Sequence, residues 1–218
     1  VSEKTRASYT QLLEQHVFPV LGDVPMQDIT AAMLKALLAG LPERFAFASR
    51  VKVYAVLHGM FKAAVMDDTL DVNPMDKVPR PKQSKDAALS AEHKAFTAEE
   101  MRYILRCLKE EPLKWQAFVL LLIDTGCRRG EACGLQWRAV DLDVGTITIE
   151  RNLQYTAERG VYETMPKNGK VRVVDISPDV AELLRALRRT QPVTVRWVFT
   201  QDDSAEPMHP DTPTRYFQ

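Results

Sequence analysis

The sequence predicts an α+β fold that is mainly α, with an all-helical first part and a small antiparallel sheet of three strands in the second. Two observations lead to this prediction. Apolar residues recur at helical spacing through the first 80 residues, where no strand-like alternation occurs. After Gly145 the apolar period changes to two, and the helical period returns after residue 177. We therefore expect helices first, then the sheet, then a further helix.

Three helices are predicted in residues 1–80, each from an apolar face at helical spacing. Pro19 and Gly22 close the first, and Thr30 caps the start of the second. The third is the longest and runs from residue 46 to residue 66. The three apolar faces consist, in order, of Tyr9, Leu12, Leu13 and His16; of Met33, Leu34, Leu37 and Leu38; and of Val53, Val56, Leu57, Met60, Phe61 and Ala64.

Residues 77–95 contain two prolines, several basic residues and almost no large apolar side chain. This composition is typical of an interdomain linker. We place an all-helical domain at residues 1–80, the linker at residues 81–95 and a second domain at residues 96–218.

The second domain opens with a capping box, Thr97-x-x-Glu100, in front of a predicted helix. Four apolar residues continue this helix at the expected spacing, namely Met101, Ile104, Leu105 and Leu108. A more apolar helix follows around residues 115–124 and ends at Gly126.

Alternating side chains predict three strands, at residues 146–150, 161–164 and 171–176. Lys167-Asn168-Gly169-Lys170 is predicted as the turn between the last two, because Asn-Gly is a strong hairpin signal. Ser177-Pro178 then starts a helix, with the serine as N-cap and the proline in the first turn.

Composition limits the class of protein. Of the 218 residues, 45% are hydrophobic and 27% are charged, which is ordinary for a globular protein in water. The longest apolar run, residues 117–123, is shorter than the ~20 residues that cross a bilayer. Three cysteines without CxxC spacing favour reduced thiols over a metal site. We therefore expect a cytoplasmic protein with no membrane partner, no metal and no cofactor.

The most informative stretch is residues 125–137, which read TGCRRGEACGLQW. An apolar helix stops at Gly126 and delivers two arginines and a glutamate to one point. Arginine suits a phosphate because its planar fork donates two parallel hydrogen bonds. Glu131, three residues after Arg128, can lie on the same helical face and hold the guanidinium in place.

Together with stretches elsewhere in the chain, this box resembles the tyrosine recombinases of the phage-integrase family. Residues 166–174, PKNGKVRVV, are similar to the β-hairpin that carries the family's catalytic lysine. In the helical part, residues 16–22 (HVFPVLG), 28–30 (DIT) and 71–74 (DVNP) look like the family's core-binding domain. The resemblance covers almost the whole chain.

The resemblance implies DNA strand exchange through a covalent link between a tyrosine and a 3′-phosphate. The attacked phosphodiester gathers negative charge in that reaction, and preorganised cations stabilise it. By resemblance, Arg128 binds this phosphate, Lys167 protonates the leaving 5′ oxygen, and Glu131 buttresses the site. Double-stranded DNA is the expected partner, and the whole protein is expected to act as a tetramer on it.

The second half of the family's site requires a His-x-x-Arg box, a further His or Trp, and the nucleophilic tyrosine. None of the 4 histidines has an arginine three residues on. Tyr216 lies in a stretch, PTRYF, that resembles the helix before that box, so we expect it to pack rather than attack DNA. With Val1 as its first residue, the chain is expected to be a piece of a longer recombinase, with a partial catalytic domain, inactive and monomeric without DNA.

Further basic residues are expected to meet phosphates of the DNA backbone. They are Arg50, Lys52, Arg80, Lys82, Lys85, Arg129 and Arg172. Arg129 and Arg172 flank the predicted site, where they are also candidates for surface or supporting charges. The net charge of zero does not exclude a DNA-binding protein, because a local basic face suffices.

Two other functions remain open on the sequence alone. One is a DNA-binding module of the same fold without a catalytic role. The other is a helical protein-interaction adaptor in which the arginine box occurs by chance.

Overall fold

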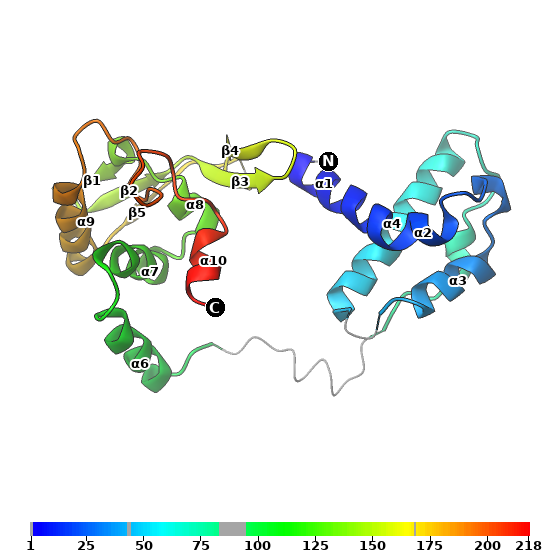
Figure 1. Cartoon of the computed structure of the whole chain (residues 1–218), viewed down its shortest axis with the longest axis horizontal. Coiled ribbons are helices and arrows are strands. Elements are labelled where there is room, and N and C mark those ends of the chain that lie inside the picture. The colour runs from blue at the N-terminus through cyan, green and yellow to red at the C-terminus, as the bar shows by residue number, and fades with distance from the viewer. Residues whose placement is uncertain (1, 43–44, 83–94, 168) are drawn as a thin grey trace. The chain divides into compact units, whose positions relative to one another are not determined.

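The computed structural model describes residues 2–42, 45–82, 95–167 and 169–218. Its backbone divides after Lys94 into two compact units, unit 1 before this point and unit 2 after it. In its described residues, unit 1 contains helices only, whereas unit 2 combines helices with small antiparallel sheets (Figure 1). The mainly α fold with a small antiparallel sheet of three strands is confirmed.

Unit 1 begins with one continuous helical stretch. A π-helical turn, Leu13–Val17, joins α1 (Glu3–Leu12) to α2 (Phe18–Leu21), and Gly22 follows as the C-cap. The prediction that Pro19 closes this helix is wrong. Pro19 lies in the first turn of α2, directly after the π-helical turn, and the helical stretch continues past it to Leu21.

The other two long helices of unit 1 match the prediction. α3 (Ala31–Ala39) begins after Thr30, whose side-chain oxygen accepts a hydrogen bond of 3.3 Å from the N–H of Met33. α4 spans Phe47–Met66, and short 3₁₀ turns complete the unit at Met26–Asp28 and Pro74–Lys77. Buried side chains of α3 and α4 dominate the core, including Leu34, Leu37, Val53, Leu57 and Phe61.

Unit 2 opens with the predicted capping box. The N–H of Thr97 donates to the Glu100 carboxylate at 2.7 Å, and the N–H of Glu100 donates to the Thr97 hydroxyl at 3.2 Å. The box starts the first of the helices in this unit, which are α6 (Ala98–Leu108), α7 (Leu113–Thr125), α8 (Arg129–Cys133), α9 (Pro178–Thr190) and α10 (Thr212–Tyr216). Side chains from α7 and α9 share one core with the sheet, including Phe118, Leu121, Leu184 and Ile147.

Two antiparallel sheets form among the described residues of unit 2. β1 (Val140–Asp141), β2 (Thr146–Ile149) and β5 (Arg172–Asp175) make a three-stranded sheet in the order β1-β2-β5. β3 (Asn152–Thr156) and β4 (Gly160–Thr164) pair as a separate hairpin (Figure 1).

This pairing corrects one prediction. Lys167-Asn168-Gly169-Lys170 does not join β4 and β5 as paired strands; Asn168 itself lies outside the described residues. β4 pairs with β3, with Tyr162 opposite Gln154, whereas β5 pairs with β2, with Val174 opposite Ile147. β3 directly precedes β4 in the chain, so a short turn pairs these two strands and leaves β5 to the longer-range partner β2.

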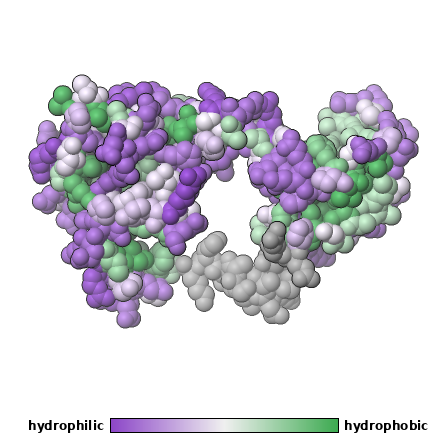
Figure 2. Space-filling model, viewed as in Figure 1, coloured by the Kyte–Doolittle hydropathy of each residue, from purple (hydrophilic) through white to green (hydrophobic). Residues whose placement is uncertain are grey.

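The face of unit 2 that is visible in Figure 2 is mostly hydrophilic. Among the described residues, no helix combines the length and the apolar character that crossing a membrane requires. The apolar sequence of α7 instead reflects burial within the protein, at Trp115, Ala117, Phe118 and Leu121.

Candidate active site

The end of α7 sets the position of the arginine box, residues 125–134. Gly126 adopts the left-handed conformation, with a φ of 61°, and thereby ends the helix as its C-cap. The chain then leads through Cys127 to Arg128, which has extended backbone and is the N-cap of α8. The turn predicted at this glycine thus places Arg128 at the start of a second helix, with its side chain 55% exposed.

Glu131 is the centre of the box. Its side chain has no exposed surface, and its carboxylate accepts hydrogen bonds from both the backbone N–H (2.9 Å) and the side-chain Nη1 (3.0 Å) of Arg128. Arg172 donates to the same carboxylate through Nη1 (3.2 Å) and Nη2 (2.6 Å). The two arginines therefore meet on one buried acid, and only Arg128 was predicted to do so.

This arrangement keeps Glu131 ionised. Burial by itself raises the pKa of a carboxyl group, because it disfavours the charged form. At Glu131 the hydrogen bonds from Arg172 and Arg128 outweigh burial, and the net result is a lowered pKa. The pKa of Arg172 is raised by its hydrogen bonds to Glu131. The acid is thus a fixed negative charge that holds two guanidinium groups.

Close packing against β3 fixes the other side of α8. A Cβ at Gly130 would lie 2.4 Å from Oδ1 of Asn152 and 2.6 Å from the backbone oxygen of Leu153. A Cβ at Gly134 would lie 3.3 Å from the backbone nitrogen of Leu153. The two glycines, one helical turn apart, let α8 approach the strand closely. The sequence contains the signal, a glycine every four residues, but not the strand that it fits.

Lys167 lies in the lysine segment, residues 165–171, between β4 and β5. Its side chain is exposed, as are those of Met165 and Val171 on either side. Arg172 directly follows the segment as the first residue of β5, opposite Ile149 of β2. The chain that carries Lys167 is therefore joined to the arginine box through Arg172.

Arg129 holds a different part of unit 2. Its Nη2 donates to Oδ1 of Asp211 at 2.9 Å, and its Nη1 donates to the hydroxyl of Thr214. Both partners belong to the start of α10 and its N-cap. In this structure the guanidinium thus connects α8 to α10. Arg129 and Arg172 both have protein partners, as supporting charges do, and the prediction that either meets DNA stays a prediction.

Tyr216 is 43% exposed, and its side chain has two partners within unit 2. Its ring stacks on Trp115, with centroids 4.2 Å apart and an interplanar angle of 23°. Its hydroxyl donates to the Glu111 carboxylate at 2.6 Å, and this hydrogen bond raises the pKa of the phenol. A raised pKa makes a phenol a poorer nucleophile, because less of it is ionised.

The buried thiols of the box are also poor nucleophiles. Burial raises the pKa of Cys127, and it raises that of Cys133 to about 12. Both therefore stay protonated at neutral pH. Within the described residues, no group of three or more His, Cys, Asp or Glu side chains could hold a metal ion.

The predicted DNA-binding residues of unit 1 differ in their surroundings. Arg50 donates to the backbone oxygens of three residues that follow α3, namely Leu41 (3.1 Å), Pro42 (2.6 Å) and Phe45 (3.3 Å). Lys52 donates to the hydroxyl of Ser8 at 2.5 Å. Arg80 and Lys82 are exposed, and Lys85 lies outside the described residues.

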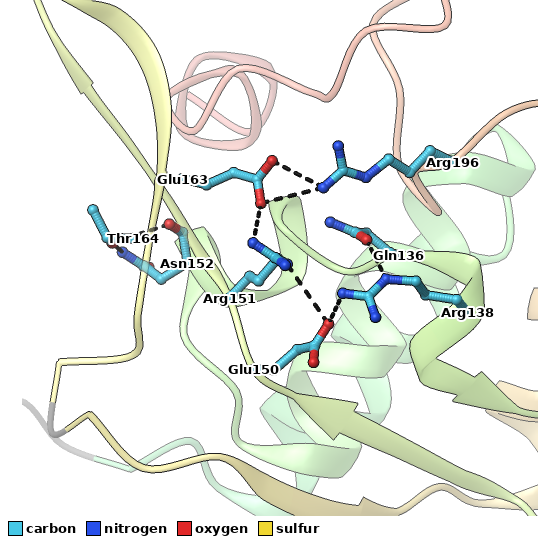
Figure 3. Close-up of polar contacts among 8 residues, drawn as sticks. All are labelled: Gln136, Arg138, Glu150, Arg151, Asn152, Glu163, Thr164 and Arg196. Atoms are coloured by element: carbon cyan, nitrogen blue, oxygen red, sulfur yellow. Dashed lines mark hydrogen bonds and ion pairs between the residues drawn. The ribbon is translucent and has the colours of Figure 1, made fainter.

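Sequence reasoning missed a second charged cluster, shown in Figure 3. Glu163 of β4 pairs with Arg151 (2.7 Å) and Arg196 (3.1 Å). Glu150 lies 3.6 Å from the Nε of Arg151 and also pairs with Arg138. Apart from the adjacent Glu150 and Arg151, the paired residues lie at least 12 positions apart in the chain, so no local motif predicts the cluster. The cluster ties the β3–β4 hairpin to the turn after α8 and to the loop after α9.

The chain was compared with known protein families and proteins. Residues 94–218 match the phage integrase family, and residues 1–80 match the phage integrase central domain. The integrase of Mycobacterium phage L5 is 27% identical over 190 residues, covering 85% of this chain and 48% of that integrase. The integrase of Enterobacteria phage 434 is 22% identical over 217 residues, covering 100% of this chain and 56% of that integrase. The chain thus spans about half the length of these curated relatives.

Solved structures share the fold. The Tn1549 transposon integrase in complex with circular intermediate DNA matches with a TM-score of 0.75 at 18% identity, covering 95% of this chain and 68% of that chain. A lambda integrase tetramer bound to a Holliday junction matches with a TM-score of 0.75 at 19% identity, covering 100% of this chain and 59% of that chain. At this level of identity, the likeness concerns the fold alone.

Proposed function

The chain belongs to the phage integrase family, and on that premise we propose that it is part of a tyrosine recombinase, which cuts and rejoins DNA strands at specific sites. The recombinase acts through a 3′-phosphotyrosyl intermediate, and the substrate is double-stranded DNA. Two kinds of relative support this proposal. The curated relatives include integrases of phages, and the structural neighbours include integrases bound to DNA.

The observation that carries the proposal is the held but exposed guanidinium of Arg128. Glu131 fixes one edge of this group through Nη1, and the side chain is still 55% exposed. Arginine has five N–H donors, so one bond to Glu131 leaves others for the oxygens of a phosphate. A cation that is already oriented stabilises the charge that develops on the attacked phosphodiester, with no reorganisation during the reaction.

The remaining chemistry falls to two other groups. Lys167 is placed in an exposed segment, where its ammonium group can reach the leaving 5′ oxygen and protonate it. No His-x-x-Arg box occurs in the 218 residues, and we infer that none of their tyrosines is the nucleophile. We therefore expect this chain to bind DNA without cutting it. It needs neither metal nor cofactor, it is a monomer without DNA, and the whole recombinase acts as a tetramer.

Duplex binding tests whether the chain binds DNA and whether Arg128 contacts a phosphate. The affinity of the 218-residue chain for a fluorescent duplex is measured by anisotropy at several salt concentrations, and it should fall as salt rises. Arg128→Gln should weaken binding and reduce the slope of log affinity against log salt by about 1, the effect of one lost phosphate contact. Arg189→Gln is the matched control, because Arg189 is an exposed arginine on α9 and lies outside the arginine box. Binding that is the same at low and high salt would contradict the proposal.

A suicide duplex, which traps cleaved strands on the protein, tests whether the chain is unable to cut DNA by itself. No covalent protein–DNA adduct should form with this chain. An adduct that disappears in Tyr216→Phe would show that Tyr216 is a nucleophile and that the chain is active by itself. The raised pKa of Tyr216 and its stacking on Trp115 argue against that result.

A further inference from the structure

Arg172 pairs with Glu131 through both of its terminal nitrogens. Oε1 of Glu131 accepts from Nη1 of Arg128 and from Nη1 of Arg172. Oε2 accepts from the backbone N–H of Arg128 and from Nη2 of Arg172. Each carboxylate oxygen therefore bridges one group of Arg128 and one nitrogen of Arg172, in the two-pronged geometry that arginine alone provides among the basic side chains.

Burial makes this bridge demanding. The Glu131 side chain has no exposed surface, so water does not reach it to replace a lost donor. A buried carboxylate that loses one of its partners keeps the cost of desolvation without the compensating bonds. The Cys127 thiol interacts electrostatically with Glu131, but a thiol is either neutral or negative and cannot replace a lost positive charge.

Arg172 also lies at the boundary between the sheet and the lysine segment. Arg172 is the first residue of β5 and pairs with Ile149, the last residue of β2. On its N-terminal side, the described residues of the lysine segment belong to no strand. Arg172 is thus the first residue after Lys167 that belongs to the sheet. Its side chain pairs with Glu131, the acid that orients Arg128.

From this geometry, and resting on the proposed function, we propose that Arg172 is a positioning residue that aligns the segment carrying Lys167 with the phosphate-binding Arg128, through the shared carboxylate of Glu131. It is not a DNA contact. Both of its terminal nitrogens donate to Glu131, and its side chain is 36% exposed, against 55% for Arg128. The two-pronged pair engages two of the five N–H donors of Arg172, so a phosphate could meet only the donors that remain.

Titration of Glu131 in the 218-residue chain tests this proposal without DNA. The carboxyl ¹³C shift of Glu131 is followed by NMR against pH in the parent sequence, in Arg172→Gln and in Arg172→Lys. Arg172→Gln should raise the pKa of Glu131 by about 1 to 3 pH units, the usual effect of one adjacent arginine. Arg172→Lys should give a smaller rise, because lysine restores the charge but not the fork. Lys170→Gln, an equal loss of charge two residues away, should leave the titration unchanged.

Amide hydrogen exchange gives the second readout. In Arg172→Gln, exchange should accelerate at residues 171–173, next to the lost anchor, and stay slow at the opposite end of β5 near residue 175. Uniformly faster exchange would indicate general unfolding, and the less disruptive Arg172→Lys then decides through its Glu131 titration. A Glu131 titration that is unchanged in both variants overturns the proposal.

DNA binding separates this proposal from the proposed function. If Arg172→Gln leaves the titration of Glu131 unchanged but lowers the salt slope of duplex binding by about 1, Arg172 is a phosphate contact and the positioning role is overturned. If the chain fails to bind DNA at all, the proposed function fails. The titration still decides whether Arg172 holds Glu131 in place.

Discussion

The arginine box and the lysine segment carry the two proposed catalytic cations, yet the protein holds them in opposite ways. In the box, Glu131, Ala132 and Cys133 are buried, and Glu131 joins Arg128 to Arg172. In the lysine segment, Met165 is 55% exposed and Val171 is 53% exposed. One region is built into the core of unit 2, whereas the other lies on its surface between two strands.

This difference corresponds to the two proposed chemical roles. A group that stabilises developing charge is most effective when it is oriented before the reaction begins. A group that delivers a proton must come within hydrogen-bond distance of the leaving oxygen, and its contacts commonly tighten only when the substrate is bound. We infer that the box is preorganised, whereas the position of Lys167 is completed by DNA.

The largest expected effect on stability is at Gly130. Gly130→Ala places a Cβ 2.6 Å from the backbone oxygen of Leu153, which cannot move as a flexible side chain can. We expect a loss of about 3 kcal/mol, typical of overpacking, despite a gain of up to about 1 kcal/mol from the better helix former. Urea unfolding followed by tryptophan fluorescence measures it, because Trp115, Trp137 and Trp197 all lie in unit 2.

Gly169→Ala is the matched control in the lysine segment. Gly169 has a φ of 65°, and no heavy atom of the described residues beyond its chain neighbours lies within 4 Å of an added Cβ. Its replacement should cost only the penalty of the left-handed conformation, about 1 to 2 kcal/mol. Equal losses at the two glycines would mean that α8 has room to move away from β3, and that the box is less rigid than its contacts indicate.

The second prediction concerns the charge at the centre of the box. Glu131→Gln should lower the free energy of unfolding at neutral pH by about 2 kcal/mol, because it weakens hydrogen bonds to two charged groups. The pKa of Glu131 is lowered in the folded state, so its stabilising effect is present above the unfolded pKa of about 4.3 and is lost as pH falls through the folded pKa. The difference in the free energy of unfolding between the parent chain and Glu131→Gln should therefore become smaller as the pH falls. If this difference stays constant from pH 7 downwards, Glu131 does not stabilise the fold as an ionised carboxylate.

The sequence predicted those parts of the site that depend on local signals. Gly126 ends α7 in the left-handed conformation that a glycine C-cap provides, and Glu131 lies three residues from Arg128 on a helix. Thr97 and Glu100 form their capping box for the same reason, since both partners lie within one turn. Spacing alone is enough to recognise such contacts.

The parts that the sequence did not predict depend on contacts between distant residues. The Asn-Gly turn suggested that β4 pairs with β5. A hairpin signal does not show whether another strand competes for the same edge, and in the structure β4 pairs with β3 while β5 pairs with β2. The pairing of β5 with β2 is what brings Arg172 to Glu131, 41 residues away. The charged cluster around Glu163 was missed for the same reason. Residue types could be read from the sequence, whereas their partners required the fold.

The smallest expected effect is at Lys167. Lys167→Ala should change the free energy of unfolding by no more than about 0.5 kcal/mol, as is usual for an exposed side chain. Lys114→Ala is the matched control. Lys114 is only 19% exposed, pairs with Asp202 and lies 5.4 Å from the ring centroid of Trp115, so its loss should cost about 1 kcal/mol. If Lys167→Ala destabilises unit 2 as much as Lys114→Ala does, the lysine segment is fixed to the folded protein before DNA binds. The lysine would then be preorganised like the box, and the contrast between the two regions would not hold.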